Sequence, residues 1–325
     1  MEFVVFAGVL LLLFIFMIVQ ELIQTKNQEK LFKKYLRENY GKEPPKEYSL
    51  VRFARLGSYL ERHKEEKQLD DITWNDLGMD EVFRRIDRTY SAAGEEYLYY
   101  TLRNISCGRE ALEHLEEVVN WLQEQENIKV RIQLLMKRLG HLGKYSLYDY
   151  LDNLDYLGER SNRKIVLGNL LYLPFLLLLF VQPAMGTIGI VLCMLWHIMT
   201  YFREKKVIEP YIISFAYVLR LIDVCEELEK QKIPVYRREL DELREALKSL
   251  RELRRGAYWV MAGNQGKIGG NPLDILADYL RMILHLDIFQ FNRMLEKLRK
   301  KTGQVETMLA ITGYLDMAIS VGGFR

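Results

Sequence analysis

The chain has 325 residues, of which 49% are hydrophobic and 28% charged, so it is long enough for one large or two modest domains and too apolar for a disordered protein. Its 46 basic and 44 acidic residues leave a formal net charge of +2, which excludes a general electrostatic attraction to DNA. Cys107, Cys193 and Cys225 are too widely scattered for a disulfide framework or a zinc site, and they suit a reducing cytoplasm.

An almost wholly apolar segment, Phe3 to Ile23, opens the chain. About 20 helical residues cross a hydrocarbon core of ~30 Å, so we expect a transmembrane anchor over residues 1–24. Only Glu2 precedes the segment as a charge, which favours an uncleaved signal anchor over a cleavable signal peptide. A charged linker is expected over residues 25–48; its lysines next to the anchor are Lys26, Lys30, Lys33 and Lys34.

Two helix starts are expected between Asp70 and Arg103. Thr73 stands three residues before Asp76, and Ser91 is followed by Ala-Ala-Gly and two glutamates, so a hydroxyl group caps free amides at each start. This pattern predicts a helix-turn-helix entry into an all-α domain whose first cytoplasmic part covers residues 49–163. The apolar residues at helical spacing are Leu77, Val82, Phe83, Ile86, Tyr97, Leu98 and Leu102.

Two more apolar segments, 165–181 and 186–202, are joined at Gln182-Pro183 and predict a transmembrane hairpin over residues 164–202. Lysine and arginine flank all three apolar segments on the side expected to face the cytoplasm. We therefore expect three crossings of the cell (inner) membrane, with the N-terminal tip outside and both core parts in the cytoplasm. The flanking residues of the hairpin are Arg160, Arg163, Lys164, Arg203, Lys205 and Lys206.

A buried core element is the alternative interpretation of the hairpin, but Leu176 to Phe180 has no polar face to meet solvent. Trp196 and His197, near the end of the third apolar segment, are more typical of anchors at an interface than of proton carriers.

The second core part, residues 203–325, is also expected to be helical. Ile208 to Glu229 forms one helix, and a leucine seam then predicts a helix packed against another long helix of the same domain. Asn271-Pro272 is expected to begin a helix that continues through Phe291, and Thr302-Gly303 separates it from the last helix. The seam consists of Leu240, Leu243, Leu247 and Leu250.

Metal-binding patterns are weak. The acids Asp70, Asp71, Asp76 and Asp80 fit no calcium loop, and helix capping accounts for two of them. His114, His141 and His285 lie far apart without cysteine partners. Nothing resembles a nucleophile, base and acid set, so we expect no enzyme, unless a longer product or a partner supplies an ATPase domain, and no cofactor in this chain.

Basic and aromatic residues are grouped at two places. Nucleic acid could use either group, but solvated helix faces near anionic lipid explain them as well or better. One group is Tyr59 with Arg52, Arg55 and Arg62; the other is Arg251, Arg254 and Arg255 beside Tyr258 and Trp259.

The order Thr89-Tyr-Ser91-x-x-Gly94-Glu95-x-x-Leu98-Tyr99-x-x-Leu102-Arg103 resembles the opening of the core (lever) domain of MutS-like DNA mismatch repair proteins. Residues 311–320, ITGYLDMAIS, resemble the last core helix before that family's ATPase domain, whereas residues 110–125 match less well. The motifs TWNDL-x-MD and SAAGEEYLY are most similar to those of a bacterial subgroup of MutS-related proteins with membrane-spanning segments. The resemblance covers roughly Ser49 to the C-terminus.

The resemblance implies a helical lever that, in a complete protein, couples binding of ATP and Mg²⁺ to closure on DNA or on another partner. Phosphate binding in that class needs Gly-x-x-x-x-Gly-Lys-Ser/Thr, and the nearest run, Gly263 to Gly270, lacks the first glycine and the hydroxyl. The sequence ends at Arg325, where the ATPase domain is expected to begin, so we expect either a fragment or a short product, or a loss of the motor. The hairpin stands where the family carries its DNA-contacting clamp.

Three partners follow from this interpretation: the membrane, DNA, and either an ATPase domain or a second copy that covers an apolar face near residues 311–324. The alternative function is a membrane-tethered helical scaffold for protein or lipid that binds neither DNA nor nucleotide.

Overall fold

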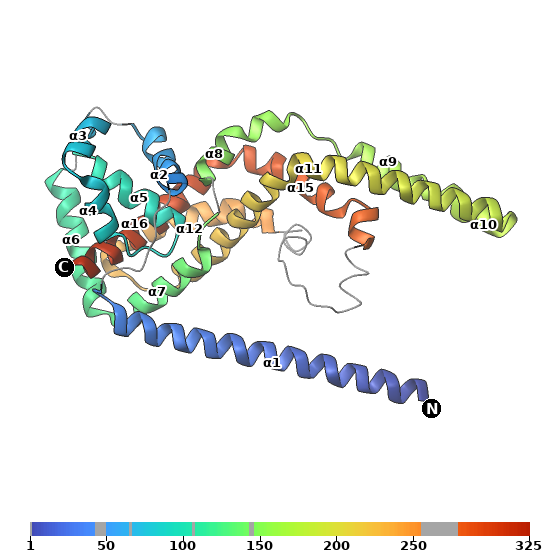
Figure 1. Cartoon of the computed structure of the whole chain (residues 1–325), viewed down its shortest axis with the longest axis horizontal. Helices are drawn as coiled ribbons and strands as arrows, with labels where there is room; N and C mark the ends of the chain where they lie inside the picture. Colours follow the sequence, from blue (N-terminus) through green and yellow to red (C-terminus); the bar gives the residue numbers. More distant parts are fainter. Residues whose placement is uncertain (1, 43–49, 65–66, 106–107, 143–145, 255–278) are drawn as a thin grey trace.

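The computed structural model describes residues 2–42, 50–64, 67–105, 108–142, 146–254 and 279–325 (Figure 1). Within these ranges the backbone is helical and forms no β-strand; Gln68 and Asn104 pair as an isolated bridge. The prediction of an all-α fold is therefore confirmed.

The α-helices before the hairpin are α1 (Glu2–Asn39), α2 (Leu50–Arg62), α3 (Asp71–Asp76), α4 (Met79–Ile86), α5 (Ala92–Arg103), α6 (Arg109–Glu124), α7 (Glu126–Leu139) and α8 (Leu147–Asp152). The hairpin and the following part contain α9 (Arg163–Leu170), α10 (Tyr172–Val181), α11 (Pro183–Glu229), α12 (Arg237–Leu250), α15 (Leu286–Arg299) and α16 (Thr302–Phe324). Three short 3₁₀ turns accompany them: η1 (Asn153–Leu157), η2 (Pro234–Tyr236) and η3 (Arg251–Arg254).

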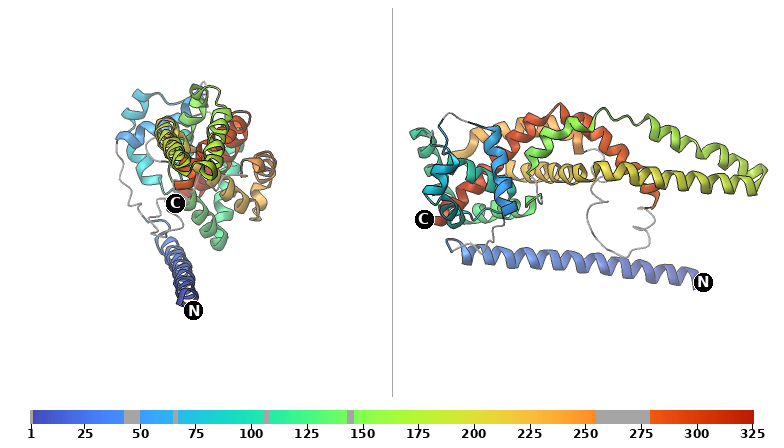
Figure 2. Two further views of the ribbon diagram at one scale, coloured as in Figure 1. Left: turned by 90° about the vertical axis from the view of Figure 1, so that its right-hand side faces the viewer. Right: turned by 45° about the horizontal axis from the view of Figure 1, so that its top comes forward.

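A helical body and two long projections make up the molecule. Helices α2 to α8, α12 and α16 gather at one end, and both α1 and the α10–α11 hairpin extend from it toward the same side (Figures 1 and 2). The end of α1 is attached to α7: the Lys129 Nζ lies 3.6 Å from the ring centroid of Tyr40, and the Lys137 Nζ lies 3.3 Å from that of Phe32. These cation–π contacts help to set the direction in which α1 leaves the body.

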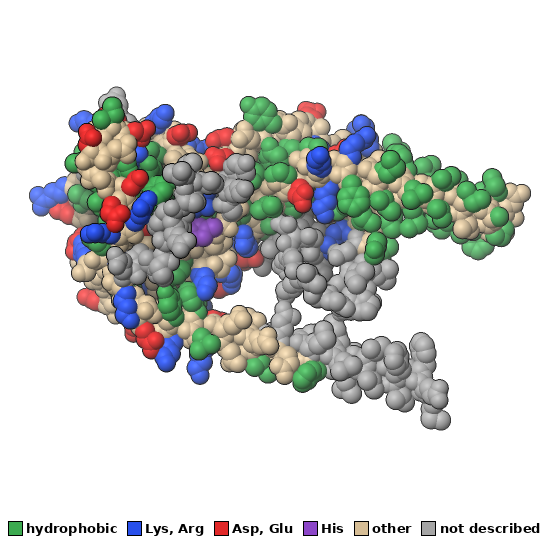
Figure 3. Space-filling model, in the orientation of Figure 1, with side chains coloured by type: hydrophobic (Ala, Val, Ile, Leu, Met, Phe, Trp, Pro, Cys, Tyr) green, Lys and Arg blue, Asp and Glu red, His purple; other side chains and the backbone are tan. Residues whose placement is uncertain are grey.

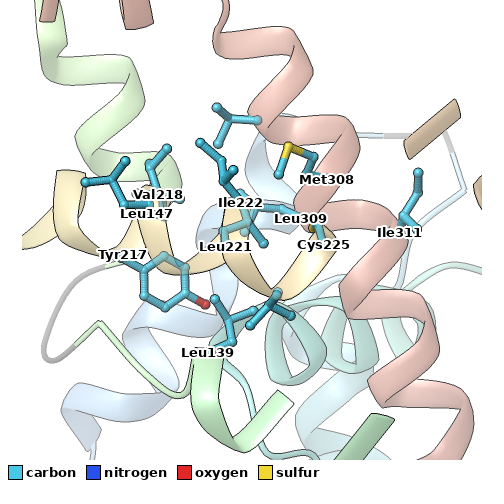
Figure 4. Close-up of a cluster of buried hydrophobic side chains, with 14 of the residues drawn as sticks. Leu139, Leu147, Tyr217, Val218, Leu221, Ile222, Cys225, Met308, Leu309 and Ile311 are labelled. Carbon is cyan, nitrogen blue, oxygen red and sulfur yellow. The ribbon is translucent and has the colours of Figure 1, made fainter. Parts of the chain in front are cut away.

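Helix α16 lies at the centre of the body, where it packs against α5, α6, α7, α11 and α12. Its apolar side chains are almost all buried, and Phe324, at 51% exposed, is the exception near its end. The expected exposed face near residues 311–324 is therefore wrong, because neighbouring helices of the same chain cover it. Figure 4 shows the core where side chains of α16, α11 and α7 meet, among them Met308, Cys225 and Leu139.

Helix α11 is a single element of 47 residues that begins at the hairpin tip and ends inside the body. Our sequence interpretation placed an apolar segment and a separate helix, Ile208 to Glu229, within this range. Pro210 lies inside the helix, where it removes one backbone hydrogen bond without ending the element. The expected leucine seam on α12 is buried, as predicted, against α16 and α11.

The hairpin is not a core element. Leu167, Leu177 and Phe180 are 67%, 69% and 89% exposed, and Figure 3 shows hydrophobic side chains covering the projection. Among the described residues, three helical stretches are long and apolar enough to cross a membrane: 163–181, α11 and α16. Only 6% of the most apolar 18-residue window of the first stretch is buried, against 72% of that of α16, so α16 belongs to the core. The side chains of residues 1–15, which carry most of the expected anchor, lie outside the described ones.

Three local expectations need correction or extension. Asp70, and not Thr73, caps α3, because its carboxylate accepts a hydrogen bond from the Thr73 backbone N–H at 2.7 Å. The helix expected to run through Phe291 is interrupted at His285, whose φ of 52° is left-handed, and α15 begins after it. The linker region is helical through Asn39 as the continuation of α1.

Candidate functional site

The N-terminus of α5 is joined to α16 by one buried carboxylate. Asp316, 1% exposed, accepts hydrogen bonds from the backbone N–H of Tyr90 at 3.0 Å and of Ser91 at 2.8 Å, and from the Ser91 hydroxyl at 2.6 Å. Ser91 also caps α5 as predicted, since its Oγ accepts from the Gly94 N–H at 3.1 Å. A negative charge beside free amides at a helix start is stabilising because it interacts favourably with the helix dipole and because it accepts strong, charge-assisted hydrogen bonds. We call this arrangement the α5–α16 joint.

Two glycines allow the helices of the joint to approach so closely. A Cβ on Gly94 would lie 2.4 Å from the Asp316 Oδ2, and one on Gly313 would lie 2.6 Å from the Ala93 carbonyl oxygen. Side chains larger than hydrogen at either position would push the two helices apart. The joint thus brings together the two segments that carry the MutS-like resemblance, although they are more than 200 residues apart in sequence.

Two consecutive buried acids follow the joint. Glu95 forms an ion pair with the buried Arg55, and its Oε2 lies 3.6 Å from the Nδ1 of His141. Glu96 accepts a hydrogen bond from the Ser146 hydroxyl at 2.8 Å. Burial raises the pKa of Glu96 to about 8, although the Ser146 hydrogen bond and Arg55 act in the opposite direction. Burial therefore favours the protonated form of Glu96 inside the body.

The acids at 70–80 take structural roles. Besides the Asp70 cap, Asp71 pairs with Arg103 at 2.8 Å, and Asp80 accepts a hydrogen bond from the Trp74 indole N–H at 2.7 Å. Across the described part of the chain, no group of three or more potential ligands could hold a metal ion.

The first basic and aromatic group is used inside the body. Tyr59 is 6% exposed, Arg55 is paired with Glu95, and Arg62 pairs with Glu306 at 2.5 Å and with Asp152. These side chains are therefore not a free basic surface. Outside the described residues or side chains lie Arg52, Arg254, Arg255, Tyr258, Trp259, Gly263 to Gly270, and Cys107, while Arg251 is described and exposed.

Four of the five histidines lie in three different environments. His114 stacks near Tyr314 and lies 3.3 Å from Glu239, and His141 lies beside Glu95. His285 meets His197, with 5.3 Å between the ring centroids. Burial, and then the neighbouring His197, lower the pKa of His285, so it is neutral at pH 7.

The two histidines line a pocket of about 400 Å³ at the base of the hairpin, bounded by α9, α11 and α15. Sequence reasoning noted its basic residues only as flanks of the apolar segments. Their convergence with residues of α15 could not be read from local patterns. We call it the hairpin-base pocket; its polar lining residues are Glu159, Arg160, Ser161, Lys164, His197, Thr200, Arg203, Glu204, His285 and Asn292.

Comparison with known proteins finds no family model that matches the chain, no similar curated protein and no similar solved structure. The MutS-like resemblance therefore remains a prediction from the sequence.

Proposed function

We propose that this chain is the helical lever, or core, module of a membrane-anchored MutS-like protein related to DNA mismatch repair, with the ATPase domain outside the chain. The α5–α16 joint is the observation that supports this proposal. The two segments that resemble the family form one packed unit, in which Asp316 bonds the backbone of Tyr90 and Ser91. Such a unit can transmit force between the ends of the body without bending, because both helices are locked at their crossing.

The membrane part of the proposal rests on the exposed apolar hairpin and on the direction of α1. Both projections leave the body on the same side, so one bilayer can receive both (Figures 1 and 2). Basic residues at the base of the hairpin support an orientation at the inner membrane with the body in the cytoplasm and the tip outside.

A membrane-tethered helical scaffold without DNA or nucleotide binding is the second candidate. The environment of the Tyr59 group favours it, since Arg55 and Arg62 form ion pairs with Glu95 and Glu306 inside the body. A scaffold of this kind would bind protein or lipid only.

Binding of the purified chain to DNA separates the two candidates. The chain is placed in nanodiscs and titrated with homoduplex and mismatched DNA over a salt series, with labelled ATP as a parallel ligand and empty nanodiscs of the same lipid as the control. The lever proposal predicts DNA binding that weakens steeply with salt, because phosphate contacts release counterions. DNA binding no stronger than that of empty nanodiscs would refute the lever proposal and leave the scaffold.

A further inference from the structure

The hairpin-base pocket lies at the boundary between the apolar projection and the charged body. Ile165, Gly168 and Trp196 line it on the hairpin side, and Arg160, Lys164 and Arg203 are among its charged residues. Figure 3 shows this change from hydrophobic to charged side chains at the base of the hairpin. A molecule bound there would meet both environments, as an amphiphile does at a membrane surface.

The charged lining has an excess of positive charge that the described residues do not neutralise. Arg160 pairs with Glu204 at 2.9 Å, so the two cancel. Lys164 and Arg203 are exposed and form no ion pair with any side chain that the structure describes, and Glu159 is the remaining acid. Two such cations at one pocket suit a phosphate group.

A buried acceptor at the same pocket has no donor among the described residues. Asn292, 7% exposed, donates its Nδ2 to the Asn162 Oδ1 at 2.9 Å, and Asn162 in turn donates to the Phe289 carbonyl oxygen at 3.0 Å. These two bonds fix the orientation of the Asn292 amide, because a flipped amide would place two oxygens together. The Asn292 Oδ1 then has no hydrogen-bond partner among the residues that the structure describes, which is a costly state for a buried polar atom.

A second, apolar groove lies along the hairpin and is lined in part by a residue of the hairpin-base pocket. Its volume is about 370 Å³, and it shares Trp196 with the hairpin-base pocket. The other lining residues come from both arms of the hairpin and are Leu171, Phe175, Leu178, Met185, Ile188, Gly189, Leu192 and Cys193. A polar pocket and an apolar groove that meet at one tryptophan match the two ends of a lipid.

We propose that the hairpin-base pocket binds the headgroup of a glycerophospholipid that carries a hydrogen-bond donor besides its phosphate, such as ethanolamine or glycerol. The phosphate lies between Lys164 and Arg203, the headgroup donor bonds the Asn292 Oδ1, and an acyl chain follows the apolar groove. Choline has no N–H or O–H to offer, so a phosphatidylcholine headgroup leaves Asn292 unsatisfied. This inference rests on the membrane placement of the hairpin and goes beyond the lever role.

Native mass spectrometry of the full chain in detergent tests the proposal. Phosphatidylethanolamine, phosphatidylglycerol and phosphatidylcholine with identical acyl chains are titrated separately. The double variant Lys164→Gln/Arg203→Gln is compared with Arg163→Gln/Lys206→Gln, which makes the same change of charge on the same two helices but outside the pocket lining. All four side chains are exposed, so thermal unfolding should be the same for both variants and confirms that both fold.

We expect the pocket variant to bind the first two lipids on the order of tenfold more weakly and the control variant to bind them as the native chain does. Phosphatidylcholine should bind weakly to all three. Asn292→Leu should reduce the preference for ethanolamine and glycerol headgroups over choline.

Equal losses in the pocket and control variants would overturn the proposal, since only the general juxtamembrane charge would then matter. Displacement of the lipid by glycerol 3-phosphate at a matched concentration would also overturn it, because the ligand would then be a free phosphate compound. Neither result affects the DNA titration, so failure of the lipid site and failure of the lever proposal are distinguishable.

Discussion

Gly94→Ala tests the α5–α16 joint most directly. The new Cβ would lie 2.4 Å from the Asp316 Oδ2 and 2.6 Å from its Cβ, so Asp316 or the whole of α16 must move. Overpacking of this kind costs about 1–3 kcal/mol. Displacing Asp316 also weakens hydrogen bonds from Tyr90 and Ser91, and bonds to a charged group contribute about 1.5–3 kcal/mol each. The higher helix propensity of alanine offsets about 1 kcal/mol of this loss of stability. We expect a net destabilisation of roughly 2–4 kcal/mol.

Gly57→Ala is the matched control, because Gly57 also lies inside a helix and its Cβ would meet nothing within 4 Å. Helix propensity then predicts that this variant gains about 0.5–1 kcal/mol. Both free energies of unfolding come from urea titrations of the chain in nanodiscs. Unfolding is followed by circular dichroism at about 222 nm, where the signal reports helix content. If Gly94→Ala is as stable as Gly57→Ala, the joint is not the close contact described above and the reasoning fails.

Two further predictions concern the buried acid and the hairpin. Because burial raises the pKa of Glu96 from 4.5 to about 8, the folded chain binds this proton more tightly than the unfolded chain, so stability should fall as pH rises between these values, by at most about 1.4 kcal/mol per pH unit. Glu96→Gln should flatten this dependence in urea titrations at several pH values; an unchanged slope would contradict the assignment. Leu173→Arg places a cation midway along the hairpin arm, on a side chain that is 54% exposed, and should cost roughly 2.5–3.5 kcal/mol of insertion, seen as a smaller carbonate-resistant membrane fraction. Tyr156→Arg, at an 85% exposed residue of the body, is its control, and equal fractions for both variants would place the hairpin outside the bilayer.

The sequence predicted those features that depend on interactions between residues a few positions apart. The Ser91 cap was predicted because a cap bonds an amide only three residues away, and the leucine seam of α12 because its period is that of the helix itself. The break at His285 was missed, since left-handed residues other than glycine are uncommon and the enrichment of histidine among them is too weak a signal to predict a break. The prediction of Thr73 as the cap of α3 was wrong because Asp70, three positions earlier, is an equally acceptable capping residue.

Long-range partners could not be predicted in the same way. Asp316 was part of a recognisable segment, yet nothing in the sequence placed its carboxylate against Ser91, 225 residues away. The hairpin-base pocket has the same origin, because Asn292 reaches the basic flanks of the hairpin only after α15 has packed on α11. Exposure of the 311–324 face was expected for the same reason, since covering helices are a tertiary property.

The length of α11 has a consequence for how the bilayer and the body can influence each other. From Phe202, at the base of the hairpin, the helix continues for 27 residues to Glu229, a distance of about 40 Å at 1.5 Å per residue. Changes in bilayer thickness are accommodated partly by the tilt of the segments that cross it. A tilt of about 10° about the base would carry the far end through roughly 7 Å, more than one helical turn. That end is embedded among the side chains of α7 and α16, so a hairpin placed in a bilayer as proposed would transmit a change in lipid thickness to the packing of the body.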